Sequence, residues 1–353
     1  MRILPVAAVT MYVGLAAFPT AAFCQTNDAV YLASGTGAAP KRGAIVAMTA
    51  TEVKLDMSGV EQSYPVNEIK QIKFADEPTA LENARNAITQ RNYNSALAEL
   101  DKIDVKTLKR DVEKHKVAFM RAYCLAQQAM TEGGDKGAAE TALRDFAKAT
   151  GGQHYRFYQT AETLGDLALA SGKFDDAVKY YGDTGLAGAP WPEYKLRANL
   201  ALGRAYYLGA KFNEALQSYE AVLASSIASP EINLLKEFAQ VGKGACLAET
   251  GKPDEGIAIV KEVIKKNDPV EKRLFAHANN ALGNCYLKVN RPKDAMLAFL
   301  QTDILFRSDG DSHAEALYHL GKLGDALNKS NLATDSRNTL RQQYAGSYWL
   351  AKP

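Results

Sequence analysis

Two series of small residues recur along most of this chain at a nearly constant spacing. The members of the first series are Ala84, Ala122, Gly165, Gly203, Gly244, Gly283 and Gly321, and those of the second are Ala96, Ala139, Ala177, Ala215, Gly256, Ala295 and Ala333. Successive members are 38 to 43 residues apart in both series. In six of the seven repeats the two markers lie 12 residues apart, and the second repeat is five residues longer. Because two independent series of residues recur with the same spacing, the sequence predicts a chain of repeated structural units.

The stretch 282–299 indicates what one unit is. Gly283 leaves room for a second helix to approach closely, and residues 290–292 form a turn. Ala295 and Phe299 then return on the inner face of the second helix, four residues apart. This arrangement, Leu-Gly-x-x-Tyr, a turn and Ala-x-x-x-Phe, resembles the tetratricopeptide repeat. The resemblance extends from residue 77 to the end of the chain and implies one helical hairpin per repeat.

A single hairpin of this kind cannot bury its own apolar stripe, so neighbouring hairpins stack. We therefore expect a mainly α fold, in which residues 77–353 form a TPR-like α-solenoid of about seven helical hairpins. The first helix of each pair would line the concave surface. The repeats exceed the family's usual length of about 34 residues, so longer second helices or longer connections are expected. At the end of the chain, Tyr344, Tyr348, Trp349 and Leu350 are expected to fold back on the last hairpin.

Residues 25–76 have a different pattern. Apolar and polar residues alternate, with turn residues between the runs, and this predicts three or four β-strands. We expect a small β-barrel-like or β-sheet domain here, similar to SH3-like or Sm-like barrels. About 50 residues are marginal for independent stability, so this domain is expected to dock on the first helices. The alternative is that its exposed strands pair with a strand of a partner.

Residues 1–24 resemble a secretory signal peptide. Arg2 precedes an apolar run over residues 3–18, which is followed by Pro19 and small residues. The run is shorter than the roughly 20 residues of a membrane-spanning helix. We therefore expect an exported protein, periplasmic or secreted, that touches a membrane only peripherally if at all. A lipoprotein is not expected, because the bulky Phe23 precedes Cys24.

Charge and motifs argue against several function classes. The 42 basic and 40 acidic residues give a net charge of +2, which provides no strong attraction to nucleic acid. The five histidines show no metal-binding spacing, and no nucleophile-elbow, phosphate-loop or dinucleotide motif occurs. Cys124, Cys246 and Cys285 follow the small marker residues and are expected to be buried. We expect no enzyme activity, catalytic residue, metal or cofactor.

Binding of a protein partner is the function that the resemblance implies. Polar and aromatic residues predicted on the concave face would contact a peptide: Arg197, Arg204, Tyr207, His277, Asn280, Asn284, Lys288, Tyr318, His319 and Lys322. The Lys and Asn pattern with which some family members grip a C-terminal carboxylate is missing from the fifth repeat. The first hypothesis is thus an exported scaffold that binds peptide or helix segments of envelope or secretion partners. The second is a substrate-recruiting or carbohydrate-binding accessory subunit of an exported enzyme complex, working through the β domain.

Overall fold

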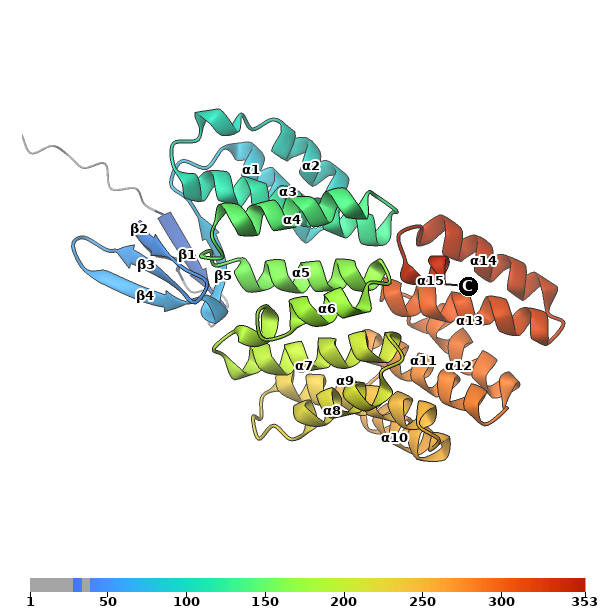
Figure 1. Cartoon of the computed structure of the whole chain (residues 1–353). Coiled ribbons are helices and arrows are strands. Elements are labelled where there is room, and N and C mark those ends of the chain that lie inside the picture. The colour runs from blue at the N-terminus through green and yellow to red at the C-terminus, as the bar shows by residue number, and fades with distance from the viewer. Residues whose placement is uncertain (1–27, 34–38, 353) are drawn as a thin grey trace, which may run out of the picture.

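The computed structural model describes residues 28–33 and 39–352 (Figure 1). The predicted signal segment, residues 1–24, lies outside the described residues. The described part is mainly helical, with a small β-sheet ahead of a long series of helices. None of its helices combines the length and the apolar character needed to cross a bilayer.

The helices form seven consecutive hairpins, which confirms the predicted α-solenoid. The pairs are α1 (Thr79–Thr89) with α2 (Tyr93–Asp101), α3 (Asp111–Thr131) with α4 (Lys136–Ala149), α5 (Phe157–Ala170) with α6 (Phe174–Tyr181), α7 (Pro192–Leu208) with α8 (Phe212–Leu223), α9 (Pro230–Glu249) with α10 (Pro253–Lys266), α11 (Lys272–Lys288) with α12 (Pro292–Leu305), and α13 (Gly310–Ala326) with α14 (Ser330–Gln343). A short helix, α15 (Tyr348–Ala351), follows the last pair.

Part of the extra length of the repeats lies in the first helices, where it was not expected. Helices α3 and α9 have 21 and 20 residues, whereas their partners α4 and α10 have 14 each. The prediction of longer second helices is therefore wrong, while long connections do occur at 102–110 and 182–191. A long first helix has a packing advantage, because α9 contacts α7 before it and α11 after it as well as its own partner.

The marker glycines of the first helices allow a close helix crossing. Each of four glycines lies against the side chain 16 residues later, on the second helix of its own hairpin. At Gly283, an added Cβ would lie only 2.6 Å from the ring of Phe299. The backbones of α9 and α10 come closer still, since a Cβ on Gly256 would lie 2.4 Å from the carbonyl oxygen of Gly244. The pairs are Gly165 with Tyr181, Gly203 with Tyr219, Gly244 with Val260 and Gly283 with Phe299.

The three cysteines of the described hairpins are buried, with free thiols. Cys124, Cys246 and Cys285 each have 0% exposed surface. Burial raises the pKa of each thiol to about 12, so all three stay uncharged at neutral pH. They therefore pack as small apolar side chains.

The N-terminal strands form one five-stranded antiparallel sheet. The strands are β1 (Asp28–Leu32), β2 (Lys41–Met48), β3 (Glu52–Asp56), β4 (Glu61–Pro65) and β5 (Ile69–Lys73). Their order is β4-β3-β2-β1-β5, with β1 between β2 and β5, so β4 and β5 are the edges of the described sheet. A β-sheet domain is therefore confirmed, and an SH3-like barrel remains a prediction.

The sheet docks on the helices through a buried ion pair. The side chain of Asp28 has no exposed surface and accepts two hydrogen bonds of 2.8 Å from the guanidinium of Arg110, just before α3. The backbone N–H groups of Ile45 and Ala75 also donate to this carboxylate, at 3.1 and 3.0 Å. Because all four donors meet on one carboxylate, Asp28 joins β1, β2 and the end of β5 to the solenoid.

Apolar contacts complete this interface. Tyr155 is buried in the core of the sheet, and Val112 of α3 and Trp191 pack against the same core. Close to Trp191 in the chain, Glu193 of α7 accepts a hydrogen bond of 2.7 Å from the side chain of Asn67. The prediction that the β domain docks on the helices is thus confirmed.

The C-terminal segment, residues 344–352, reaches beyond the last hairpin. Trp349 packs on Tyr318 of α13 with 5.6 Å between ring centroids, as expected for a segment that folds back. In addition, Tyr348 makes an edge-to-face contact of 5.3 Å with Phe174 at the start of α6. Gly346 lies against the end of α3, in the second hairpin, where an added Cβ would be 2.2 Å from the carbonyl oxygen of Ala129. The seventh hairpin is thereby fixed to the second and third, and Figure 1 shows α15 beside the end of α5.

Candidate functional site

Charged side chains of four first-helix regions lie near one another on the inner side of the solenoid. We call them the central charge cluster: Glu162, Asp166, Arg204, Arg273, His277, Asp309 and Asp311. Arg204 of α7 forms an ion pair with Asp311 of α13, three hairpins later. The curvature of the solenoid therefore brings its fourth and seventh hairpins together.

The other members of the cluster connect neighbouring helices. His277 Nε2 lies 3.4 Å from Asp309 Oδ2, and Arg273 Nε lies 3.5 Å from Asp309 Oδ1. Asp166 of α5 accepts a hydrogen bond of 2.6 Å from the hydroxyl of Tyr181. The acidic groups of the cluster thus come from α5 and the start of α13, and its basic groups come from α7 and α11.

The concave environment changes the acidity of these groups. Desolvation raises the pKa of Asp166 to about 6, although the hydrogen bond from Tyr181 and the charges of Arg204 and Arg273 oppose the rise. Burial lowers the pKa of His277 against the opposing effect of Asp309. Burial alone would raise the pKa of Asp309, but its neighbour His277 holds that pKa well below its usual range.

Five of the ten residues predicted to bind a peptide are partly exposed or exposed and contact acidic groups of this chain. The pairs are Arg197 with Glu162, Arg204 with Asp311, His277 with Asp309, Asn284 with Glu315 and Lys288 with Glu249. These contacts join first helices of different hairpins. In this conformation the five side chains serve the solenoid itself.

The other five predicted residues are less exposed than a peptide site requires or pack on the C-terminal segment. Asn280 is 1% exposed and donates to the backbone carbonyl of Ser312 at 2.7 Å and to the carboxylate of Glu315 at 3.1 Å. Tyr207 packs on Phe212, with 5.7 Å between ring centroids. The remaining three lie around Trp349: Tyr318 contacts it directly, His319 lies 5.8 Å from it, and Lys322 stacks on the Tyr318 ring.

The acidic residues of the cluster were not among the residues predicted to bind a peptide. Asp166 stands one residue after marker Gly165, as Arg204 stands one residue after Gly203. Glu162 likewise stands three residues before its marker, at the same position as Asn280 in the sixth repeat. Reading the third repeat in the register used for the fourth and sixth would have found both carboxylates.

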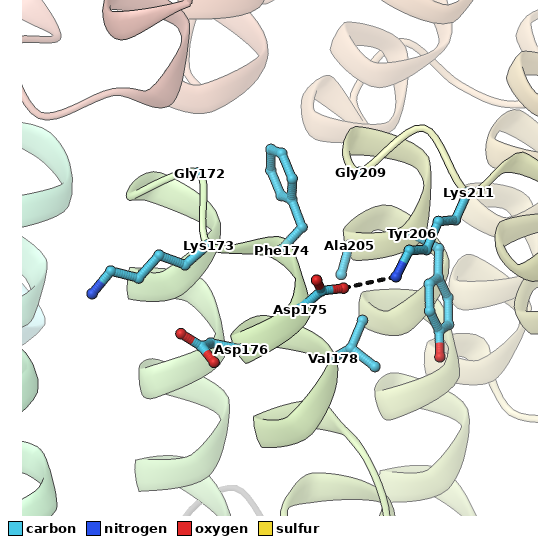
Figure 2. Close-up of a pocket in the computed structure, with 10 residues that line it drawn as sticks. All are labelled: Gly172, Lys173, Phe174, Asp175, Asp176, Val178, Ala205, Tyr206, Gly209 and Lys211. Carbon is cyan, nitrogen blue, oxygen red and sulfur yellow. Dashed lines mark hydrogen bonds and ion pairs between the residues drawn. The ribbon is translucent and has the colours of Figure 1, made fainter.

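A separate pocket of about 320 Å³ lies at the turns of the third and fourth hairpins. Figure 2 shows Asp175 and Lys211 reaching toward each other across it, while Lys173 points away. The 2.7 Å ion pair between Asp175 and Lys211 and the 3.1 Å pair between Lys173 and Glu140 account for the charges near it. Asp176, the other charged residue of its lining, lies 3.1 Å from Lys179, so the charged side chains around this pocket are all paired within the chain.

No group of three or more His, Cys, Asp or Glu side chains that could hold a metal ion occurs in the described part of the chain. Two histidines of the described part are instead held neutral in aromatic surroundings. His319 stacks on Phe299 at 4.5 Å between ring centroids, and burial lowers its pKa to about 3. His154, 1% exposed, has its pKa lowered to about 3 by burial as well.

These histidines predict a loss of stability in mild acid. In the unfolded chain, each histidine binds a proton below about pH 6.5. In the native state, these two histidines bind a proton only below about pH 3. The free energy of unfolding should therefore fall with pH by up to about 1.4 kcal/mol per pH unit for each histidine. In urea titrations at pH 7 and pH 5, His319→Phe should lose less stability than the parent chain. An equal loss in both proteins would contradict the neutral state of His319.

Comparison with known proteins agrees with this fold. A family model described as Tetratricopeptide repeat matches residues 162–230. Among solved structures, a tetratricopeptide repeat protein from Parabacteroides merdae is 15% identical with a TM-score of 0.54, covering 75% of this chain and 92% of its own. The apo form of the quorum sensor NprR from B. thuringiensis is 12% identical with a TM-score of 0.50, covering 74% and 85%. No curated protein sequence matches this chain. These likenesses show a TPR-like solenoid.

Proposed function

We propose that this chain is a protein-interaction scaffold that binds an extended peptide or helix segment of a partner on the concave surface of the solenoid. The observation that carries the proposal is the central charge cluster, where exposed charges of both signs meet on the inner side. Catalysis has no place in this proposal, because the cluster contains no nucleophile positioned by a base.

The ion pairs of the cluster are suited to exchange with a ligand. The side chains of Arg273 and Asp311 are 70% and 47% exposed, and that of Arg204 is 27% exposed. Ion pairs with this much solvent contact contribute roughly 0–1 kcal/mol. A partner that brings its own charges could therefore replace them at little cost in stability.

Asp166 would give the site its preference. The residue keeps solvent-accessible surface, although the surrounding helices desolvate its carboxyl group enough to raise the pKa to about 6; in the described chain this group has a hydroxyl neighbour but no ion pair. A lysine or arginine of a bound segment would find an unneutralised carboxylate there. We therefore propose that the partner segment carries a basic residue opposite Asp166, and acidic residues near Arg204 and Arg273.

We further propose that the protein acts after export, with envelope or secreted partners. The signal-like composition of residues 1–24 supports this part of the proposal.

Site-specific photo-cross-linking in the native cells tests the proposal. A photoreactive residue at Asp166 or Arg273 should capture a partner whose cross-linked site maps to one short segment. Glu262 of α10 is the matched control, because it is exposed on a second helix and should capture nothing. Sequencing the N-terminus of this protein, isolated from the same cells, tests export. If the protein is exported, we expect its chain to start near residue 25.

The result can also favour the other hypothesis. A photoreactive residue at Val46, 50% exposed on β2, reports on the β domain. Capture at Val46 with none at Asp166 or Arg273 would assign partner binding to the β domain and end the concave-face proposal.

A further inference from the structure

A second pocket, of about 270 Å³, lies where the β-sheet meets the solenoid. Its walls come from edge strand β5, from α1 and α3, and from the segment just before α5. The basic groups in these walls are Lys70, Arg85, Lys116, His154 and Arg156. This pocket is separate from the central charge cluster and is built from different residues.

Three nitrogen atoms of these side chains are buried without a hydrogen-bond partner in the described chain. They are Arg85 Nη1, His154 Nε2 and Arg156 Nε. An unpaired buried polar group costs about 1–3 kcal/mol, so three around one pocket need an explanation.

All three atoms are donors. The guanidinium nitrogens can only donate. In His154, Nδ1 accepts the backbone N–H of Arg156 at 3.1 Å, so the hydrogen of the neutral ring is on Nε2. His154 is 1% exposed and stays neutral, because burial lowers its pKa to about 3. The missing partner must therefore supply acceptors.

The charge of the walls favours an anion. Glu77 pairs with both Arg85 and Lys116, so one carboxylate serves two cations. Arg156 has no ion pair in the described chain: its Nη1 donates to Gln159 at 2.6 Å, and its guanidinium lies 4.7 Å from the centroid of the Tyr155 ring. The pocket is thus left with excess positive charge. Burial lowers the pKa of Lys116 to about 8; Glu77 opposes this shift, while the charges of Arg85 and Arg156 add to it.

The rest of the lining is apolar or aromatic. Ile88, Phe119, Met120, Tyr123 and Tyr155 contribute side chains beside the donors. A volume of about 270 Å³ is slightly below the range of about 300–1,000 Å³ that is typical of ligand pockets, so only a small ligand would fit. An inorganic ion would leave the apolar walls without contacts, whereas a small molecule with an apolar body would fill them.

We propose that this pocket binds the carboxylate of a small organic acid with an apolar or aromatic body. The two oxygens of a carboxylate present about four acceptor sites, enough for the three unpaired donors. The apolar body would lie against Phe119 and Met120. Because the walls come from β5 and from three hairpins, the bound acid would also hold the β-sheet on the solenoid.

Calorimetric titration of the full mature chain with matched probes tests this on the unmodified protein. Phenylacetate should bind, and phenylacetamide, of nearly the same shape but uncharged, should bind at least about tenfold more weakly. Inorganic phosphate tests for a bare anion site. The peptide acetyl-Ala-Ala-Phe, with a free or an amidated C-terminus, tests whether the carboxylate comes from a peptide.

Substitutions locate the site. Arg156→Met keeps the side-chain length and removes a cation that has no ion pair, so binding of phenylacetate should weaken at least about tenfold. Arg144→Met is the matched control, because Arg144 lies on α4 away from the pocket, and it should leave binding unchanged. The comparison of phenylacetate with phenylacetamide decides the question even if Arg156→Met folds poorly.

Four results would overturn the proposal. They are no binding of phenylacetate, equal binding of phenylacetamide, binding of phosphate or of the free-acid peptide alone, and unchanged binding by folded Arg156→Met. None of these results bears on the concave surface, so the two proposals fail separately.

Discussion

Gly283→Ala should destabilise the protein by about 1–3 kcal/mol, even though alanine is normally the better helix former by about 1 kcal/mol. The added methyl group would lie 2.6 Å from the ring of Phe299, whose side chain is fully buried. Neither the ring nor the backbone of α12 can move without disturbing the core around it. The urea midpoint, followed by circular dichroism, measures the effect.

The seventh hairpin provides a control at the same position of the repeat. A Cβ on Gly321 would meet the flexible side chain of Arg337, 3.3 Å away and partly exposed. Gly321→Ala should therefore be neutral or stabilising by up to about 1 kcal/mol. Phe299→Leu should recover part of the loss when combined with Gly283→Ala. If Gly283→Ala and Gly321→Ala behave alike, the close crossing is not what requires glycine.

Asp28→Ala should cost about 3 kcal/mol or more and loosen the β-sheet from the helices. The change removes the acceptor of two Arg110 hydrogen bonds and of two backbone N–H groups, those of Ile45 and Ala75. Losing one partner of a buried ion pair is expensive, because the other charge loses compensation. In the variant, Arg110 would keep only Glu113 as a carboxylate partner. Urea titration measures the loss, and limited proteolysis near residues 75–78 reports on the docking.

The matched control for this change is Glu61→Ala. Glu61 is an exposed carboxylate on edge strand β4 and forms no ion pair in the described chain. Its removal should change stability by less than about 0.5 kcal/mol. A similar small effect of Asp28→Ala would mean that apolar contacts alone hold the sheet in place.

The hairpins could be predicted because their cause is local. A small residue such as Gly203 and an aromatic residue such as Tyr219 keep a fixed separation within one hairpin, and the turn between them has its own residue pattern. The alternation of β-branched and polar residues predicted the strands in the same way. Five strands formed where three or four were counted, because short strands with few apolar residues, such as β4, give a weak signal.

Long-range contacts could not be predicted. Asp28 and Arg110 are 82 residues apart, and neither stands in a pattern that indicates the other. The pairing of Arg204 with Asp311 depends on how much the solenoid turns per hairpin, which the repeat spacing does not encode. The candidate site was therefore predicted residue by residue on α7, α11 and α13, but without its partners. The pocket beside β5 was missed because the sheet's docking orientation creates it.

The contacts of the C-terminal segment also limit how this architecture can grow. Most stacked arrays can gain or lose a unit at an end, because each hairpin packs only against its neighbours. Here the place of an eighth hairpin is taken by Trp349 on α13, while Tyr348 and Gly346 already occupy surfaces of the third and second hairpins. An added unit would have to displace all three contacts at once. A duplication of any internal hairpin would likewise move the tail out of reach of its partners on the second and third hairpins.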